Sequence, residues 1–161
     1  MPLPNLEQKL DTEGLHNFLG RIYPIFRSTL GNKSAIFLDF PVNLKKKPYL
    51  DLDGIMYEWG FHHIITIEKL GSEDREFCLP RAKRIRFPRH YIDSVDTLKV
   101  WQRAKNNEQK YYISDENFDY LVVLSQRKDY IVLISAFPID SNRYKQKMLK
   151  EYEHYKIDIS G

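Results

Sequence analysis

Apolar runs separated by short polar breaks predict β-strands in the second half of the chain. Three runs follow one another closely, namely KYYIS at 110–114, DYLVVLS at 119–125 and YIVLISAF at 130–137. Short connections require neighbouring strands to be antiparallel, and QRKD between the last two runs has the length of a hairpin turn. Because the second and third runs are almost wholly apolar, we expect them at the centre of a sheet that is covered on both faces.

Apolar residues at helical spacing predict a helix near each end of the chain. The N-terminal helix should kink or end at Pro24, and its apolar positions are Leu15, Phe18, Leu19, Ile22 and Phe26. The C-terminal helix covers NRYKQKMLKEYEHY, and Ser141 is its expected cap. Its apolar stripe should pack on the sheet while its lysines stay in solvent; the stripe consists of Tyr144, Met148, Leu149, Tyr152 and Tyr155, and the lysines are Lys145, Lys147 and Lys150.

Weaker patterns occupy the remaining segments. AIFLDF at 35–40 predicts a short strand, and the β-branched residues of FHHIITIEKL at 61–70 predict another. A short helix is expected after Ser94, followed by a loop over RAKNNEQK. Together these elements predict an α+β fold in which helices pack against a roughly four-stranded antiparallel sheet.

Chain length and the change in pattern along the chain predict the domain organisation. With 161 residues the chain has the length of one domain and a short appendage. We expect residues 1–57 to form an N-terminal extension of helix and loop, and residues 58–161 to form the α+β domain. The sequence of the extension does not indicate a role for it.

Composition and charge narrow the class of protein. The chain is 42% hydrophobic and 29% charged, as ordinary globular proteins are, and its net charge of +3 is only mildly basic. Cys78 is the single cysteine, which excludes an internal disulfide and a cysteine-rich zinc site and fits a reducing compartment. No apolar run is long enough to cross a membrane, and the N-terminus lacks the pattern of a signal peptide. We therefore expect a cytoplasmic protein that makes no membrane contact.

A basic stretch, RAKRIRFPRHYI at 81–92, interrupts this balanced charge. It places five basic side chains within nine residues without a carboxylate between them, Arg81, Lys83, Arg84, Arg86 and Arg89. Such repulsion is typical either of a solvated face or of a site for phosphate. Apolar residues between the charges could anchor the arginines, which would favour a phosphate site.

The chemistry available to an enzyme is limited by the motifs that are missing. The sequence has no GxxxxGK[ST] or GxGxxG loop, no HExxH and no GxSxG. The remaining histidines, arginines and tyrosines are the groups that metal-free RNA cleavage requires, because protons must be moved at the 2′ and 5′ oxygens while charge builds up on phosphorus. His62 and His63 would point to opposite faces of the predicted strand, and the apolar period does not choose between them.

The order of these segments resembles a known group of nucleases. RAKRIRFPRHYI, then KYYISDENFDYLVVLSQRKDYIVLISAFPID, then the lysine-rich RYKQKMLKEYEHY is similar to the phage and bacterial nuclease-like families grouped with barnase, EndoU, colicin nuclease and RelE domains. The resemblance implies a compact α+β fold and a metal-independent, cofactor-free endoribonuclease, often a toxin. Its substrate would be RNA such as tRNA or mRNA, and an antitoxin or immunity protein would be its partner.

The resemblance also assigns roles to residues. His63 would carry the proton, Arg81 and Arg84 would clamp the phosphate, and Ser135 would be the small polar group near the scissile phosphate. Further contacts with RNA are expected from the rest of the basic stretch and from the first turn of the last helix, at Arg86, Arg89, Arg143 and Lys145. The alternative is a non-catalytic protein that uses the same basic groove to bind RNA or a protein partner.

Overall fold

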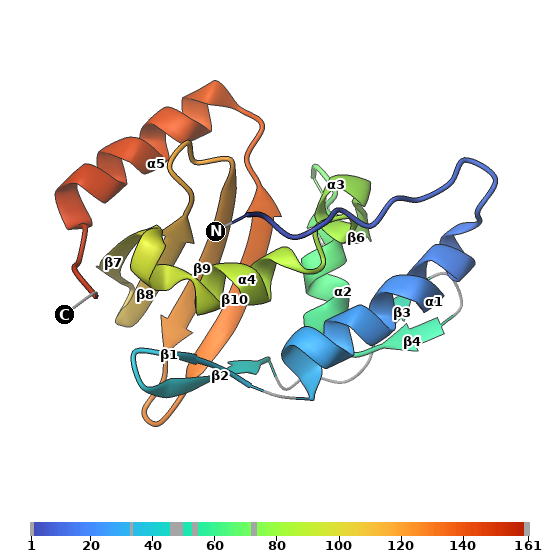
Figure 1. Cartoon of the computed structure of the whole chain (residues 1–161), viewed down its shortest axis with the longest axis horizontal. Coiled ribbons are helices and arrows are strands. Elements are labelled where there is room, and N and C mark those ends of the chain that lie inside the picture. Colours follow the sequence, from blue (N-terminus) through green and yellow to red (C-terminus); the bar gives the residue numbers. More distant parts are fainter. Residues whose placement is uncertain (1, 33, 46–49, 53–54, 72–73, 160–161) are drawn as a thin grey trace.

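A single mixed β-sheet forms the centre of the protein (Figure 1). The computed structural model describes residues 2–32, 34–45, 50–52, 55–71 and 74–159. The six strands of the sheet lie in the order β1 (Ala35–Phe37), β2 (Phe40–Leu44), β10 (Ile131–Pro138), β9 (Tyr120–Gln126), β8 (Glu108–Ser114) and β7 (Lys99–Lys105). Neighbours are antiparallel except β2 and β10, which run parallel.

The predicted α+β class is confirmed, but the predicted sheet was too small. Strands β7 to β10 form the expected antiparallel meander, and β1 and β2 extend it on the β10 side. The structure has a hairpin where a single strand was expected at 35–40. Its two turn residues, Leu38 and Asp39, have φ angles of 49° and 68°. Leucine rarely adopts this left-handed conformation, so the pattern gave no turn signal.

The described residues form five α-helices, three of which are short. Their bounds are α1 (Leu15–Phe26), α2 (Trp59–Ile65), α3 (Leu79–Ala82), α4 (Phe87–Asp93) and α5 (Asn142–Tyr155). Helices α1, α2 and α3 lie together beside the sheet (Figure 1). Pro24 lies within α1 without ending it, and the chain continues as a π-helix, η1 (Arg27–Gly31). The predicted C-terminal helix is confirmed, and the Ser141 hydroxyl accepts a hydrogen bond from the Tyr144 amide.

The strand predicted at 61–70 is wrong for most of its length. These residues complete helix α2 and then form β5 (Thr66–Glu68), which pairs with β6 (Arg75–Phe77). Tertiary packing explains why β-branched residues are helical here, because Phe61 is fully buried against three aromatic rings. The two histidines therefore follow one another on a helix and do not point to opposite faces of a strand.

The helix predicted after Ser94 is also wrong. Only a 3₁₀ turn, η2 (Val95–Thr97), precedes strand β7, and the expected loop over RAKNNEQK is the hairpin that joins β7 to β8. Asn106 and Asn107 form its turn, with φ angles of 53° and 62°. Asparagine tolerates this conformation well, so the pair was the signal for a hairpin. A further hairpin, β3 (Leu50–Leu52) with β4 (Ile55–Tyr57), lies outside the main sheet.

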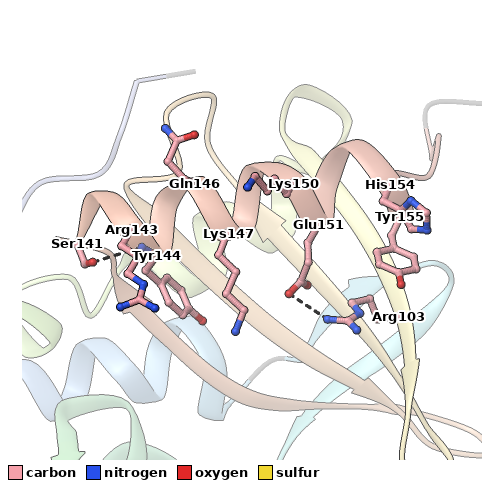
Figure 2. A pocket seen from close by; sticks show the side chains of 10 residues that line it. All are labelled: Arg103, Ser141, Arg143, Tyr144, Gln146, Lys147, Lys150, Glu151, His154 and Tyr155. Carbon is pink, nitrogen blue, oxygen red and sulfur yellow. Dashed lines mark hydrogen bonds and ion pairs between the residues drawn. The ribbon is translucent and has the colours of Figure 1, made fainter.

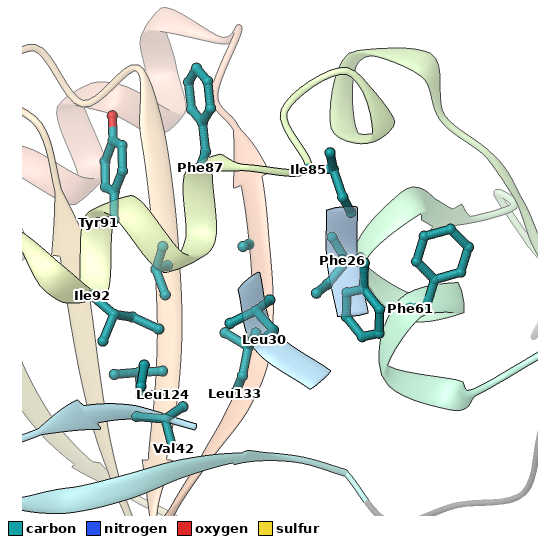
Figure 3. Close-up of a cluster of buried hydrophobic side chains, with 14 of the residues drawn as sticks. Phe26, Leu30, Val42, Phe61, Ile85, Phe87, Tyr91, Ile92, Leu124 and Leu133 are labelled. Atoms are coloured by element: carbon teal, nitrogen blue, oxygen red, sulfur yellow. The ribbon is translucent and has the colours of Figure 1, made fainter. Parts of the chain in front are cut away.

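Two hydrophobic clusters lie on opposite faces of the sheet. The larger one joins the sheet to α1, α2 and α4 and includes Phe26 and Val42 from the predicted extension together with Phe61 and Leu124 (Figure 3). The smaller one lies under α5 and consists of Trp101, Phe118, Leu121, Val123, Ile139 and Met148. Residues on both sides of the predicted boundary at 57/58 thus share one sheet and one core.

The described part of the chain contains no helix with the length and apolar character needed to span a bilayer.

Candidate functional site

Two of the predicted catalytic residues, His63 and Arg81, lie close to each other. Arg81 of α3 donates a hydrogen bond from Nη1 to the Thr66 carbonyl at 3.0 Å, and its guanidinium lies 5.0 Å from the centre of the Phe137 ring. Burial, together with the positive charges of Arg75, Arg81 and Lys45, lowers the pKa of His63 to about 3. The imidazole is therefore neutral at physiological pH.

The contacts around His63 also have a structural role. Arg75 donates to the carbonyl of Thr66 at 2.6 Å and to that of His63 at 3.3 Å, so two guanidinium groups satisfy carbonyls at the C-terminal end of α2. The His63 ring is stacked on Trp59 with centroids 4.5 Å apart, and its Nδ1 is buried without a hydrogen-bond partner among the described residues. A histidine with so low a pKa is a weak general base near neutral pH.

Arg84 and Ser135 occupy other places. Arg84 donates to the Pro80 carbonyl at 2.7 Å and lines a cavity of about 550 Å³ with Tyr91 and Tyr120, and no described contact joins it to His63. Ser135 is half-buried on β10, next to an irregularity in the pairing with β9. It pairs with Val123, so its side chain lies on the α5 side of the sheet.

Two further arginines of the basic stretch, Arg86 and Arg89, are engaged within the protein. The Nε of Arg86 lies 2.9 Å from the Glu7 carboxylate. Arg89 pairs with Asp93 at 2.9 Å and donates from Nη1 to the Thr29 carbonyl. These partners come mostly from the first 30 residues, so the stretch fastens the N-terminal part of the chain to the rest.

A groove that the sequence reasoning missed lies alongside α5 (Figure 2). This α5 groove has a volume of about 1110 Å³ and is lined by Arg103, Ser141, Arg143, Tyr144, Gln146, Lys147, Lys150, Glu151, His154 and Tyr155. Its basic residues are spaced by four, three and four positions along α5, from Arg143 to His154. That spacing places them on one stripe of the helix. The spacing is readable in the sequence, although the apolar pattern by itself predicts only that Lys147 and Lys150 lie in solvent.

The electrostatics of the α5 groove are dominated by cations. Its carboxylate, Glu151, is bound to Arg103 at 3.0 Å and accepts a hydrogen bond from the Trp101 indole at 3.3 Å. Arg143, Lys147 and Lys150 are exposed and make no hydrogen bond or ion pair with any described residue. The groove therefore presents three positive charges that nothing in the described part of the chain neutralises.

Lys145, the other cation predicted in the first turns of α5, lies off this stripe. Its Nζ is 2.6 Å from the carboxylate of Asp119, so its charge is paired. Of the two RNA-binding residues predicted on α5, the structure places Arg143 in the groove and Lys145 outside it.

Aromatic rings connect the α5 groove to the region of Arg81. Tyr144 lines the groove, and its ring centroid lies 6.3 Å from that of Phe137. Phe137 in turn lies beneath the Arg81 guanidinium. Burial, together with the nearby charge of Glu151, raises the pKa of Tyr144, so its hydroxyl stays protonated. One end of the groove thus leads towards the His63 and Arg81 pair.

Comparisons with protein-family models, with curated proteins and with solved structures found no match for this chain. Among the described residues, no group of three or more histidine, cysteine, aspartate or glutamate side chains is placed to hold a metal ion.

Proposed function

We propose that the protein binds RNA and that the α5 groove holds the phosphate backbone. The observation that carries this proposal is a stripe of exposed cations, Arg143, Lys147 and Lys150, next to two tyrosines in a groove; these cations make no hydrogen bond or ion pair with any described residue. A row of positive charges can pair with the successive phosphates of a nucleic acid, and tyrosine rings can stack on its bases. We infer that the encounter takes place in the cytoplasm, as the single cysteine suggests.

The geometry of the stripe sets the expected strength of the electrostatic contribution. With a rise of about 1.5 Å per residue, the cations are separated by about 4.5 to 6 Å along the axis of α5. Three engaged phosphates would give a log-log salt slope of roughly −2, since each phosphate contributes about −0.7 on a single strand. Binding should therefore weaken by roughly one to two orders of magnitude between 50 and 200 mM salt.

Fluorescence anisotropy with a labelled RNA dodecamer across a salt series tests this proposal. The variant Lys147→Ala/Lys150→Ala should bind more weakly and reduce the salt slope by about 1.4. Lys105→Ala/Lys128→Ala is the matched control, because it removes two exposed lysines that do not line the groove. Equal losses in the two variants, or no binding by the native protein, would refute the proposal.

RNA cleavage is the second candidate function, and the proximity of His63 to Arg81 favours it. A neutral imidazole can take the proton of the 2′-OH while a guanidinium stabilises the charge on the phosphate. Burial weakens His63 as a base, so we expect slow cleavage and place binding first. A toxin-like role with an antitoxin or immunity protein belongs to this candidate, on the strength of the resemblance to phage and bacterial nucleases.

Incubation of the purified protein with tRNA, mRNA and total RNA in EDTA tests cleavage. If His63 and Arg81 act on the substrate, His63→Ala and Arg81→Ala should each slow cleavage by about two orders of magnitude. His16→Ala is the control, since His16 is exposed on α1. Intact RNA in the presence of excess protein would exclude metal-free cleavage and leave the binding proposal standing.

A further inference from the structure

The α5 groove presents rings as well as charges, and the two kinds of side chain form separate lines. With about 100° per residue, Arg143, Lys147, Lys150 and His154 fall within about 60° of one another around the helix. Tyr144 and Tyr155 lie on the next line, closer to the sheet, as Figure 2 shows for their side chains below α5.

The tyrosines mark the two ends of the groove. Tyr155 follows Tyr144 by eleven positions, which corresponds to about 16 Å along α5. Tyr155 is 37% exposed, and the guanidinium of Arg103 lies 5.0 Å from the centre of its ring. The ammonium of Lys147 lies 6.0 Å from the ring of Tyr144, and the ring of Phe137 lies 6.3 Å from that of Tyr144. Each ring is thus held beside a cation.

Parallel lines of charges and rings fit one form of nucleic acid better than another. In a single strand the bases are free to turn away from the backbone and stack on aromatic side chains, while the phosphates follow a positively charged groove. In a duplex the bases are stacked and paired inside, so the rings beside the cations would have no partner. An acidic protein segment would use the cations but would not need the rings.

We infer that the ligand of the α5 groove is single-stranded RNA, with bases stacked on Tyr144 and Tyr155 and phosphates on Arg143, Lys147 and Lys150. The inference rests on the proposed function. It adds that the bound RNA is single-stranded, and it names the residues that contact its bases. A groove of about 16 Å covers on the order of four nucleotides, the lower end of the range for single-strand-binding domains.

Anisotropy with three probes built from strands of equal length tests the inference: a single-stranded RNA dodecamer, the duplex formed with its complement, and an abasic dodecamer. We expect the single strand to bind at least tenfold more tightly than either of the others. Tyr155→Leu should weaken single-strand binding by about five- to a hundredfold, because one stacked base is lost. The same change should leave duplex and abasic binding unaltered.

Tyr130→Leu is the matched control, because Tyr130 is equally exposed, at 37%, and does not line the groove. Tyr144→Leu repeats the test at the other end, with a urea unfolding curve to show that the half-buried site still folds. The exposed Tyr155 keeps the test decisive if Tyr144→Leu is unstable.

The outcomes separate the inference from the proposed function. Equal affinity for all three probes, with continued dependence on Lys147 and Lys150, would overturn the single-strand inference while RNA binding in the groove stands. Failure to bind any of the probes would overturn both. Tighter binding of a polyglutamate peptide than of the single strand would also overturn the inference, since it would indicate an acidic protein partner.

Discussion

Lowering the pH from 7 to 5 should destabilise the protein through His63. Burial and three neighbouring cations lower the pKa of this imidazole from 6.5 to about 3. Below pH 6.5 the unfolded chain takes up a proton at His63, whereas the folded protein does not until the pH approaches 3. The unfolded state therefore binds more protons in this window, and the free energy of unfolding falls as the pH falls.

The size of the effect follows from the shift. At pH 5 the pH is about 1.5 units below the pKa of the imidazole in the unfolded chain. Each unit corresponds to about 1.4 kcal/mol, so the upper limit for the loss of unfolding free energy is about 2 kcal/mol. Because His63 is partly accessible to solvent, screening reduces the expected loss to about 1 kcal/mol.

Urea unfolding monitored by circular dichroism at pH 7, 6 and 5 measures this loss. His63→Gln removes the titrating group, so its unfolding free energy should fall by about 1 kcal/mol less than that of the native protein over the same range. The contribution of the carboxylates is common to both proteins and cancels in the comparison. His16→Gln, at an exposed position, should follow the native curve. Parallel curves for native protein and His63→Gln would refute the reasoning.

Two further predictions concern the stability of the fold, and a third concerns the pKa of His63. Trp101→Ala should lower the free energy of unfolding by about 3 to 5 kcal/mol in urea titrations, because the indole is fully buried under α5; a loss below about 1 kcal/mol would contradict this packing. Asp115→Ala should cost about 2 kcal/mol in the same assay, since its carboxylate accepts backbone hydrogen bonds from Asn117, Asp119 and Tyr120. Arg75→Met should raise the pKa of His63 in an NMR titration, because it removes a nearby positive charge. An unchanged pKa would show that the charge of Arg75 does not act on His63.

The C-terminal half of the fold could be predicted because its signals are local. The strands β9 and β10 are almost wholly apolar runs joined by a short turn, and α5 has a serine cap and a four-and-three spacing of apolar residues. These patterns agree with the tertiary packing, since β9 is buried along almost its whole length.

The predictions for the rest of the fold failed where tertiary packing or turn conformation overrides the local sequence preference. Helix α2 contains β-branched residues and is held by the aromatic contacts of Phe61 with rings that lie far away in the sequence. The hairpin of β1 and β2 turns at Leu38, which no turn rule favours. The hairpin turn at Asn106 and Asn107 follows a rule that could have been applied.

The candidate site shows why counting charges is not enough. The basic stretch at 81–92 predicts a phosphate site, but Arg86 is paired with Glu7, which lies far away in the sequence, and Arg89 is paired with Asp93 on its own helix. On α5 the apolar pattern predicts only that Lys147 and Lys150 are exposed to solvent, and the structure places both in a groove, without hydrogen-bond or ion-pair partners among the described residues. The useful signal was the spacing of the cations along a helix, next to aromatic residues.

Photo-crosslinking locates the RNA most directly. A single-stranded RNA that carries 4-thiouridine is irradiated with the native protein at low salt, and the crosslinked peptides are identified by mass spectrometry. We predict crosslinks within α5, on peptides that contain Tyr144 or Tyr155, and their loss at high salt. Crosslinks confined to residues 81–92, with none on α5, would contradict RNA binding in the α5 groove.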